Sequence, residues 1–491
     1  MVHALIHHRA AVVFNLLVSE NQDMDRAPLQ QCYDAQRAAF ISKMPGLVER
    51  RAALSALERA LLRNKTQVIA AISDDFGGRA AEETLALELF PTLAEIRHAI
   101  AHLKRWMAPR RAPVSWQFWP ASARVLYQPL GVVGILSAWN YPLFLSLVPL
   151  ANALAAGNHV MLKPSEFAPR TAELMASIAT ELFPKEYVAV IIGQADTGSA
   201  FSKLPFDHLL FTGSSRVGKL VMRAASENLT PVTLELGGKS PAIVHRDYPF
   251  ETAAERILTA KLYNAGQTCV APDYALIPSD RLEGFTELAR GLVARMYPRV
   301  VANPDYTRII NVRHYRRLLA LIEDARSKGA KILEINPVSE PCDETNRVFP
   351  PTLAATVRDD MAIMQEEIFG PILPVVPYET LDAALEYVNA RPHPLAFYYF
   401  DHNRARVQQV LGKTFAGGVT VNDCMFHVGQ CNLPFGGVGP SGMGCYHGFD
   451  GFETFSKKKG VFFESRWTPL SLLRPPYGPT ARRLLKFIVG A

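Results

Sequence analysis

The chain has 491 residues, a formal net charge of +6 and a hydrophobic content of 49%, with 20% of its residues charged. A chain of this length exceeds what one hydrophobic core supports, so two or three domains are expected. Basic and acidic residues are mixed along most of the chain, which argues against a nucleic-acid partner. The 6 cysteines show no C-x-x-C spacing, which argues against a zinc site and a disulfide-stapled secreted domain. We therefore expect no metal and a reducing, cytoplasmic location.

The N-terminal part of the chain divides into an extension and a helical region. Residues 10–18 are apolar but are interrupted by Asn15, and they fall short of the roughly 20 residues that span a bilayer. Met24 opens an ordinary polar start, so we interpret residues 1–23 as a dispensable extension. From residue 30 to residue 107 apolar side chains recur at steps of three and four, which predicts helices lying on one face of a sheet.

Strand-like and helical segments then alternate. A proline-rich stretch at residues 109–120 precedes a strand at 123–128, which is either an arm or a tethered surface loop. Short apolar strands separated by longer helices indicate βαβ units and a parallel sheet buried on both faces, with a nucleotide site at the carboxyl ends of the strands. The predicted strands are 132–137, 160–162, 188–192 and 208–211, and the predicted helices are 143–156, 169–182 and one that starts at 215.

A second alternating pattern begins at Glu235 and predicts a separate catalytic α/β domain. The glycine-rich run at 435–444 could line a substrate tunnel or make a tight turn. The predicted strands are 242–244, 274–277, 331–334 and 419–422, and the predicted helices are 251–263, 282–296 and 315–328. Residues 482–489 form a basic amphipathic helix that could lie on an anionic membrane, although docking on the protein itself is favoured.

Two reactive side chains stand out in this region. Cys269 lies in the turn-prone segment 264–272, directly after a predicted helix, where it could face a cleft as a nucleophile. A lone cysteine is more often an inert buried hydrophobe. Glu235 ends a strand-like run 34 positions earlier (269 − 235), just before two glycines, and could act as a base. The alternative is a structural carboxylate that pairs with a lysine.

Two strand ends offer candidate contacts to a nucleotide, although no G-x-G-x-x-G motif follows a strand. Gly213 ends one strand, and Ser214 can cap the next helix, whose N–H groups and dipole suit a pyrophosphate. Such a junction can also be only a cap. Lys163 and Glu166 leave another strand end and could grip the hydroxyls of a ribose, or form an exposed turn.

These stretches together resemble the aldehyde dehydrogenase superfamily. The resemblance implies a Rossmann-type parallel-sheet cofactor domain, an α/β catalytic domain and a small β oligomerisation arm. The segments 271–274 and 441–448 resemble the class 3 branch, which includes coniferyl, fatty and aromatic aldehyde dehydrogenases. Further matching motifs are Trp139-Asn140-Tyr141-Pro142, Gln365-Glu366-Glu367-Ile368-Phe369-Gly370-Pro371 and Leu433-Pro434-Phe435-Gly436-Gly437.

The resemblance implies an NAD(P)-dependent oxidation of an aldehyde to the acid, without transfer to coenzyme A. Cys269 would form a thiohemiacetal and then a thioester. Asn140, which could otherwise be a simple turn-former, would stabilise the oxyanion together with the backbone N–H of Cys269. Glu235 would activate the hydrolytic water. We expect desolvation to raise the pKa of Glu235, and the pKa of Cys269 to fall so that thiolate is plentiful.

The implied cofactor is NAD, and NADP could also be accepted. The carboxylate of Glu166 should disfavour a 2′-phosphate. Glu367 would hold the nicotinamide ribose and Phe369 would pack on the ring, although a phenylalanine beside Gly-Pro can also be turn packing. The predicted cofactor-binding residues are Trp139, Lys163, Glu166, Gly213, Ser214, Gly218, Leu236, Gly237, Glu367 and Phe369.

The substrate remains open between aromatic aldehydes, such as coniferyl aldehyde, and medium- or long-chain aliphatic ones. Two other functions stay in view, a cysteine-dependent esterase or hydrolase and a non-enzymatic binding protein on the same fold. A homodimer through the arm is expected. The aromatic residues Trp116, Trp119, Tyr141, Phe144 and Phe426 indicate an apolar pocket, although most should be core. The predicted boundaries are 24–110 and 129–234 for the NAD-binding domain, 235–418 for the catalytic domain, 111–128 and 419–466 for the arm, and 467–491 for the tail.

Overall fold

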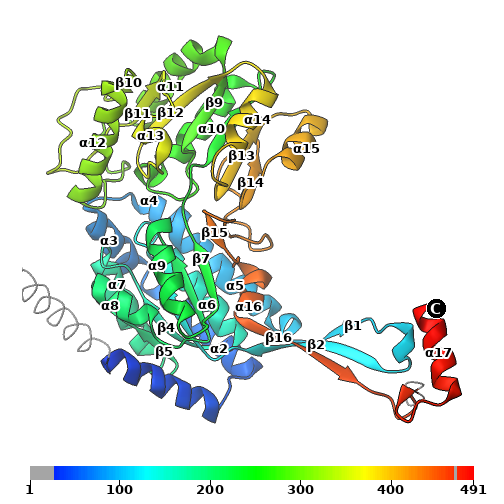
Figure 1. The fold of residues 1–491 in the computed structure, drawn as a ribbon. Coiled ribbons are helices and arrows are strands. Elements are labelled where there is room, and N and C mark those ends of the chain that lie inside the picture. The colour runs from blue at the N-terminus through cyan, green and yellow to red at the C-terminus, as the bar shows by residue number, and fades with distance from the viewer. Residues whose placement is uncertain (1–26, 469–472, 491) are drawn as a thin grey trace, which may run out of the picture.

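The computed structural model describes residues 27–468 and 473–490, which form two lobes and a projecting arm (Figure 1). The extension predicted at residues 1–23 lies outside the described residues. Within the described ranges, none of the helices is long and apolar enough to cross a membrane. The α/β architecture with parallel sheets confirms the predicted fold class.

The first lobe is built on a six-stranded sheet in the order β15-β7-β6-β3-β4-β5. Only β15 runs antiparallel to its neighbour. All residues of β3, β4 and β6 are buried, as expected for a parallel sheet covered by helices on both faces. The strands are β3 (Val132–Leu136), β4 (His159–Lys163), β5 (Val188–Val190), β6 (His208–Thr212), β7 (Val232–Glu235) and β15 (Gly442–Met443).

Helices from three parts of the chain cover this sheet. Residues 27–42 are helical and begin the described chain. Every residue of α6 is buried, because α6 packs against α5, α2 and α16 as well as β4. The helices of this lobe are α2 (Leu47–Arg63), α3 (Lys65–Phe76), α4 (Ala81–Thr84), the π-helical turn η1 (Leu85–Leu89), α5 (Phe90–Trp106), α6 (Phe144–Ala156), α7 (Pro169–Leu182), α8 (Ala195–Ser202), α9 (Ser215–Ser226) and α16 (Gly448–Thr454).

The second lobe contains a seven-stranded sheet in the order β10-β11-β12-β9-β8-β13-β14. Its pairs are parallel except β10 with β11. The strands are β8 (Pro241–Val244), β9 (Tyr274–Pro278), β10 (Lys331–Glu334), β11 (Thr352–Ala355), β12 (Ile372–Tyr378), β13 (Ala396–Phe400) and β14 (Gly418–Val421). The helices are α10 (Phe250–Leu262), η3 (Tyr263–Gly266), η4 (Ser279–Arg281), α11 (Leu282–Met296), α12 (Val312–Ser327), α13 (Ala362–Gln365), α14 (Leu381–Asn389) and α15 (Arg404–Lys413).

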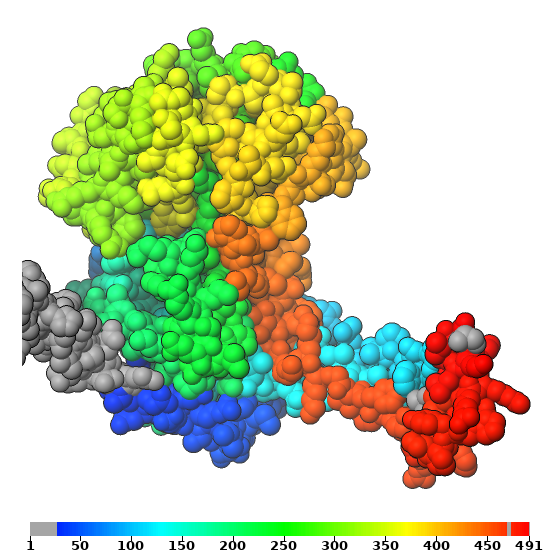
Figure 2. Space-filling view, in the orientation of Figure 1, coloured from blue at the N-terminus to red at the C-terminus, as the bar shows by residue number. Residues whose placement is uncertain are grey.

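The arm is a three-stranded antiparallel sheet in the order β1-β2-β16 that leaves the first lobe and carries α17 near its tip (Figures 1 and 2). It consists of β1 (Arg110–Ala112), η2 (Trp116–Phe118), β2 (Ser122–Pro129), β16 (Ser456–Phe463) and α17 (Pro479–Val489). The prediction that residues 419–466 belong to the arm is wrong for most of that range. β14 completes the seven-stranded sheet, β15 pairs with β7, and only β16 lies in the arm.

Candidate active site

A cavity of about 1530 Å³ carries the three predicted catalytic side chains, Cys269, Glu235 and Asn140. Glu235 is the last residue of β7, and Asn140 lies between β3 and α6. Cys269 follows η3 in the second lobe. The ends of strands in the first lobe therefore face a loop of the second lobe, as expected for a ligand site at the carboxyl edge of a parallel sheet.

Cys269 lies in a turn whose backbone is unusual. Asn264 and Ala265 have φ angles of 53° and 49°, in the left-handed region that non-glycine residues seldom adopt. The thiol is partly exposed to the cavity and has no disulfide partner. Burial, followed by the nearby carboxyl groups of Glu367 and Glu235, raises the pKa of Cys269 to about 12. The expectation that this pKa falls is wrong for the protein without nucleotide, because the thiolate would be poorly hydrated between two carboxyl groups.

Glu235 is 3% exposed, and neither of its carboxyl oxygens has a hydrogen-bond partner among the described residues. Burial alone raises its pKa well above the usual value, as predicted. The alternative of a structural carboxylate paired with a lysine is wrong, since Lys239 pairs with Asp273 instead. An isolated buried carboxyl group costs free energy, so its position at the cavity points to a chemical role.

Asn140 is 2% exposed and is held from both ends. The Asn140 side-chain Nδ2 donates to the backbone carbonyl oxygen of Gln267 at 3.1 Å, and the backbone carbonyl oxygen of Asn140 accepts from Asn264 Nδ2 at 2.9 Å. An amide has two hydrogens, and the structure records an acceptor for one of them. The second hydrogen has no acceptor among the described residues, a geometry that suits the predicted oxyanion donor.

Seven of the ten predicted cofactor-binding residues line the same cavity: Trp139, Gly213, Ser214, Leu236, Gly237, Glu367 and Phe369. Three others lie outside its lining. Lys163 ends β4, with its Nζ 3.6 Å from Glu166 Oε2, as two groups that share a ribose would be placed. Gly218 lies in α9, where an added Cβ would come within 2.7 Å of Leu236 Cδ2, so its role is close packing of the helix.

The residues present fit a bound dinucleotide. An added Cβ at Gly237 would lie 1.9 Å from Glu367 Oε2, so any larger residue there would displace the Glu367 carboxyl group. Glu367 Oε1 is buried and finds no hydrogen-bond partner among residues 27–468 and 473–490, and a ribose hydroxyl could supply one. Ser214 caps the 12-residue helix α9, whose N-terminus faces the cavity and suits a pyrophosphate. The Trp139 and Phe369 rings pack edge to face in the same cavity, with their centroids 5.4 Å apart.

Comparison with known proteins gives the same interpretation. The family model "Aldehyde dehydrogenase family" matches residues 13–461. The chain belongs to the aldehyde dehydrogenase family. It is 53% identical over 458 residues to a probable coniferyl aldehyde dehydrogenase of Pseudomonas aeruginosa, covering 93% of this chain and 95% of that one. It is 45% identical over 467 residues to a coniferyl aldehyde dehydrogenase of a Pseudomonas species, covering 94% and 96%.

Solved aldehyde dehydrogenases have the same fold. A substrate-bound enzyme of Staphylococcus aureus matches with a TM-score of 0.88 at 37% identity, over 94% of this chain and 99% of that one. A Mycobacterium tuberculosis aldehyde dehydrogenase complexed with NAD+ matches with a TM-score of 0.82 at 29% identity, over 90% and 91%. These findings confirm the predicted family, the enzyme class and the nicotinamide cofactor. This aldehyde dehydrogenase is thus an oxidoreductase that acts on aldehydes.

The structure also corrects and extends the predicted pocket. Trp116 and Trp119 lie on the arm, 66% and 70% exposed, and not in the cavity, whereas Tyr141, Phe144 and Phe426 do line it. Sequence analysis missed several buried groups around the site. His314 contacts Trp139, and a network of Arg79, Glu83 and Glu88 lies beneath Asn140 and the cysteine turn. Among the many charges of the helical N-terminal region, their spacing carried no distinguishing signal.

Proposed function

We propose that this aldehyde dehydrogenase oxidises an aromatic aldehyde of the coniferyl type to its carboxylic acid, with NAD as the preferred cofactor. The observation that carries the proposal is one cavity that joins Cys269, Glu235 and Asn140 to aromatic walls. Tyr141, Phe144 and Phe426 could pack against a flat ring. The similarity to coniferyl aldehyde dehydrogenases supports the aromatic class over a medium- or long-chain aliphatic aldehyde.

The first chemical step is attack by the sulfur of Cys269 on the aldehyde carbon. A C–S bond forms, and the carbonyl oxygen becomes an oxyanion that accepts hydrogen bonds from Asn140 Nδ2 and the backbone N–H of Cys269. A donor of this kind contributes about 3 kcal/mol to the transition state. Because the pKa of the thiol is raised to about 12, the attack also requires that the thiol proton pass to solvent in the cavity, which leaves Glu235 free for the later hydrolysis.

The bound nicotinamide supplies the hydride acceptor. Trp139, Gly237, Glu367 and Phe369 are the residues that would hold its end of the dinucleotide beside Cys269, and Lys163 with Glu166 would hold the adenosine ribose. The carboxylate of Glu166 opposes a 2′-phosphate by like-charge repulsion, which favours NAD over NADP. Loss of the hydride leaves the acyl group on Cys269 as a thioester.

Hydrolysis of the thioester requires an activated water. Glu235 is the proposed base, since its carboxyl oxygens have no hydrogen-bond partner among the described residues and burial raises its pKa well above the usual value. Water attacks the acyl carbon and gives one proton to Glu235, the C–S bond breaks, and the proton passes from Glu235 to the leaving sulfur, so that the acid and the thiol are released.

The test is a panel of initial rates of NADH formation with coniferyl, benzyl and C2 to C16 aliphatic aldehydes, repeated with NADP. The proposal predicts the highest kcat/KM for the cinnamyl or benzyl compounds and a preference for NAD. A maximum at a long aliphatic chain would overturn the aromatic assignment. Ester cleavage without nucleotide, but no NADH from any aldehyde, would favour the hydrolase alternative.

We also propose a homodimer formed through the arm. Trp116, Trp119, Phe462 and Phe463 are at least 47% exposed on the arm sheet and its loop, an apolar surface that a second copy would cover. Light scattering at micromolar concentration should give twice the monomer mass of 54.3 kDa. A reducing compartment such as the cytoplasm is proposed because all six cysteines are free.

A further inference from the structure

The turn before Cys269 has to be held by something outside itself. Asn264, Ala265 and Gly266 are three consecutive residues with positive φ, and two of them carry a Cβ that this conformation disfavours. Strain of this kind persists only where neighbouring groups fix the backbone. The groups that fix this turn therefore control where the Cys269 sulfur lies.

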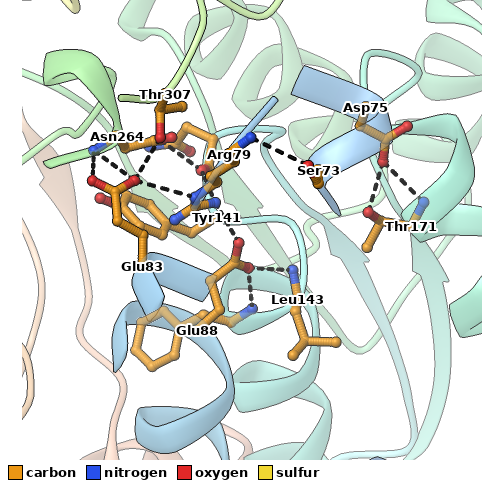
Figure 3. A network of polar contacts seen from close by, with 12 residues as sticks. Ser73, Asp75, Arg79, Glu83, Glu88, Tyr141, Leu143, Thr171, Asn264 and Thr307 are labelled. Atoms are coloured by element: carbon orange, nitrogen blue, oxygen red, sulfur yellow. Dashed lines mark hydrogen bonds and ion pairs between the residues drawn. The ribbon is translucent and has the colours of Figure 1, made fainter. Parts of the chain in front are cut away.

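Glu83 in α4 is the first of these groups. Its carboxylate accepts from the backbone N–H of Asn264 at 3.1 and 3.3 Å and from Thr307 Oγ1 at 2.6 Å. Figure 3 shows Glu83 facing Asn264 and Thr307. Glu83 is 8% exposed, and Asn264 is fully buried. The Asn264 side chain in turn donates to the Gln267 carbonyl oxygen at 3.1 Å and to the Asn140 carbonyl oxygen at 2.9 Å. The Glu83 carboxylate thus holds Asn264, and Asn264 links the turn before Cys269 to the backbone of Asn140.

Glu88 in η1 holds the other side of the same bridge. Its Oε2 accepts from the backbone N–H groups of Leu143 and Phe144 at 2.8 and 3.3 Å. These groups lie at the start of α6, three and four residues after Asn140. Glu88 therefore fixes the turn that carries the amide, as an acidic side chain does at a helix N-terminus.

Arg79 joins the two carboxylates. Its guanidinium lies 2.6 Å from Glu88 Oε1 and 3.7 Å from Glu83 Oε2, and Figure 3 shows it between them. It also lies 4.9 Å from the centre of the Tyr141 ring, whose hydroxyl contacts Thr268 Oγ1 at 2.7 Å. All three charged residues are at most 8% exposed. Arg79 Nε and Nη2 have no hydrogen-bond partner among the described residues, so the buried guanidinium depends on its ion pairs with the two carboxylates, and loss of either carboxylate should be costly.

We propose that Arg79, Glu83 and Glu88 are positioning residues that set the place of the Cys269 sulfur relative to the Asn140 amide. The inference rests on the proposed function for the roles of those two side chains. The network touches both loops but does not line the cavity, so it acts through them. Its loss should weaken acylation and leave dinucleotide binding intact, because none of the three residues is among those that would hold the nucleotide.

The test compares Glu83→Gln and Glu88→Gln with Asp75→Asn. Asp75 is a matched control: it is a partly buried carboxylate that accepts from Thr171 Oγ1 at 2.6 Å and from the backbone N–H groups of Thr171 and Arg170 at 2.9 Å, away from the site. Thr307→Val is a milder variant that removes one donor to Glu83, in case the charge-changing variants fold poorly. For each protein, the Tm, the Kd for NAD+ and the rate and amplitude of the NADH burst are measured.

We expect the two glutamine variants to acylate on the order of 10- to 100-fold more slowly per active site, because small misplacements of reacting groups have effects of this size. Thr307→Val should slow acylation about threefold or more, less than loss of the carboxylate charge, because it removes one hydrogen bond of the same network. The Kd for NAD+ should stay within about twofold, and Asp75→Asn should keep the wild-type burst rate even where its Tm falls. Equal burst rates in Glu83→Gln, Thr307→Val and the wild-type protein would overturn the inference, as would losses that track Tm in all variants.

A second readout does not depend on aldehyde oxidation. Release of the turn should expose the partly exposed Cys269 thiol further, so nucleotide-free Glu83→Gln should react with iodoacetamide at least fivefold faster than wild type or Asp75→Asn, as read by peptide mass. Unchanged alkylation in Glu83→Gln contradicts the inference even if the wild-type enzyme oxidises no aldehyde. Failure of the wild-type protein to form NADH would instead refute the proposed function.

Discussion

Replacement of Glu235 by glutamine separates the two halves of the proposed reaction. Glutamine has the shape of the carboxyl group but cannot accept a proton from water, so hydrolysis of the thioester should slow by about 10²- to 10⁴-fold, or roughly 3–5 kcal/mol. Hydrolysis should then limit turnover, and the first NADH equivalent should still form in a burst. Intact mass spectrometry of the quenched mixture should show the acyl group on the protein.

The same substitution has an opposite effect on stability. The Glu235 carboxyl group has no hydrogen-bond partner among the described residues, so replacing it breaks no hydrogen bond within the protein. Its pKa is raised in the folded state, so ionisation lowers stability as pH rises above 4.5, by about 1.4 kcal/mol per pH unit up to the raised pKa. Glu235→Gln should therefore unfold at higher urea concentration than wild type near pH 8.

The two readouts together refute or support the reasoning. Slow turnover with a full burst and unchanged or increased stability supports Glu235 as the base. Turnover at the wild-type rate would refute that role. Slow turnover with a marked loss of stability would mean that Glu235 is structural after all, which its unpartnered oxygens contradict.

Three further predictions address the other groups of the site and the buried histidines. Asn140→Ala should lower kcat by about a hundredfold, or 3 kcal/mol, with little change in the KM for NAD+, and steady-state rates check it; an unchanged kcat would remove Asn140 from the oxyanion site. Gly237→Ala should raise the Kd for NAD+ at least tenfold in a fluorescence titration, because the added methyl group overlaps Glu367, and equal affinity would contradict that placement. Burial lowers the pKa of His208 to about 4 and of His447 to about 3, from 6.5. The folded state thus opposes protonation of these histidines, so their contribution to the free energy of unfolding is fully present above pH 6.5 and is lost as pH falls. At pH 5 each histidine should lower the free energy of unfolding, measured in urea, by roughly 2 kcal/mol. An equal free energy of unfolding at pH 7 and pH 5 would contradict this prediction.

Several elements of both lobes were predictable because their signals are local. The helices at 169–182 and 282–296 have the bounds expected from apolar spacing. The strands β3, β4 and β6 were found to within one residue at each end, since their central residues are apolar. The strands β11, β12 and β13 were not predicted, because parallel pairing depends on partners far away in sequence.

The arm boundary failed for the same reason. Residues 418–421 read as an ordinary short strand, and only its pairing with β13 places it in the second lobe. Most of the residues that the motifs name line one cavity, and they could be named in advance because the motifs resemble those of a known family. Glu83 and Glu88 were missed because a buried carboxylate in a helical region cannot be told from a solvated one without knowing which backbone groups it meets.

The expected pKa of Cys269 shows a different limit. A low pKa was inferred from what the chemistry needs, whereas the structure surrounds the thiol with burial and two carboxyl groups. The chemistry needs a low pKa of Cys269 in the enzyme with bound nucleotide, whereas the structure shows the protein without nucleotide. A sequence can name the nucleophile, but the electrostatics depend on which groups of the other lobe come near it.

The central claim is that Cys269 forms the covalent bond to the substrate. The most direct measurement mixes a Cys269→Ala protein, at active-site concentration, with coniferyl aldehyde and NAD+ in a stopped-flow instrument at 340 nm. We predict no NADH above the rate without protein, with folding and NAD+ affinity unchanged. NADH formation at the wild-type rate would contradict the account.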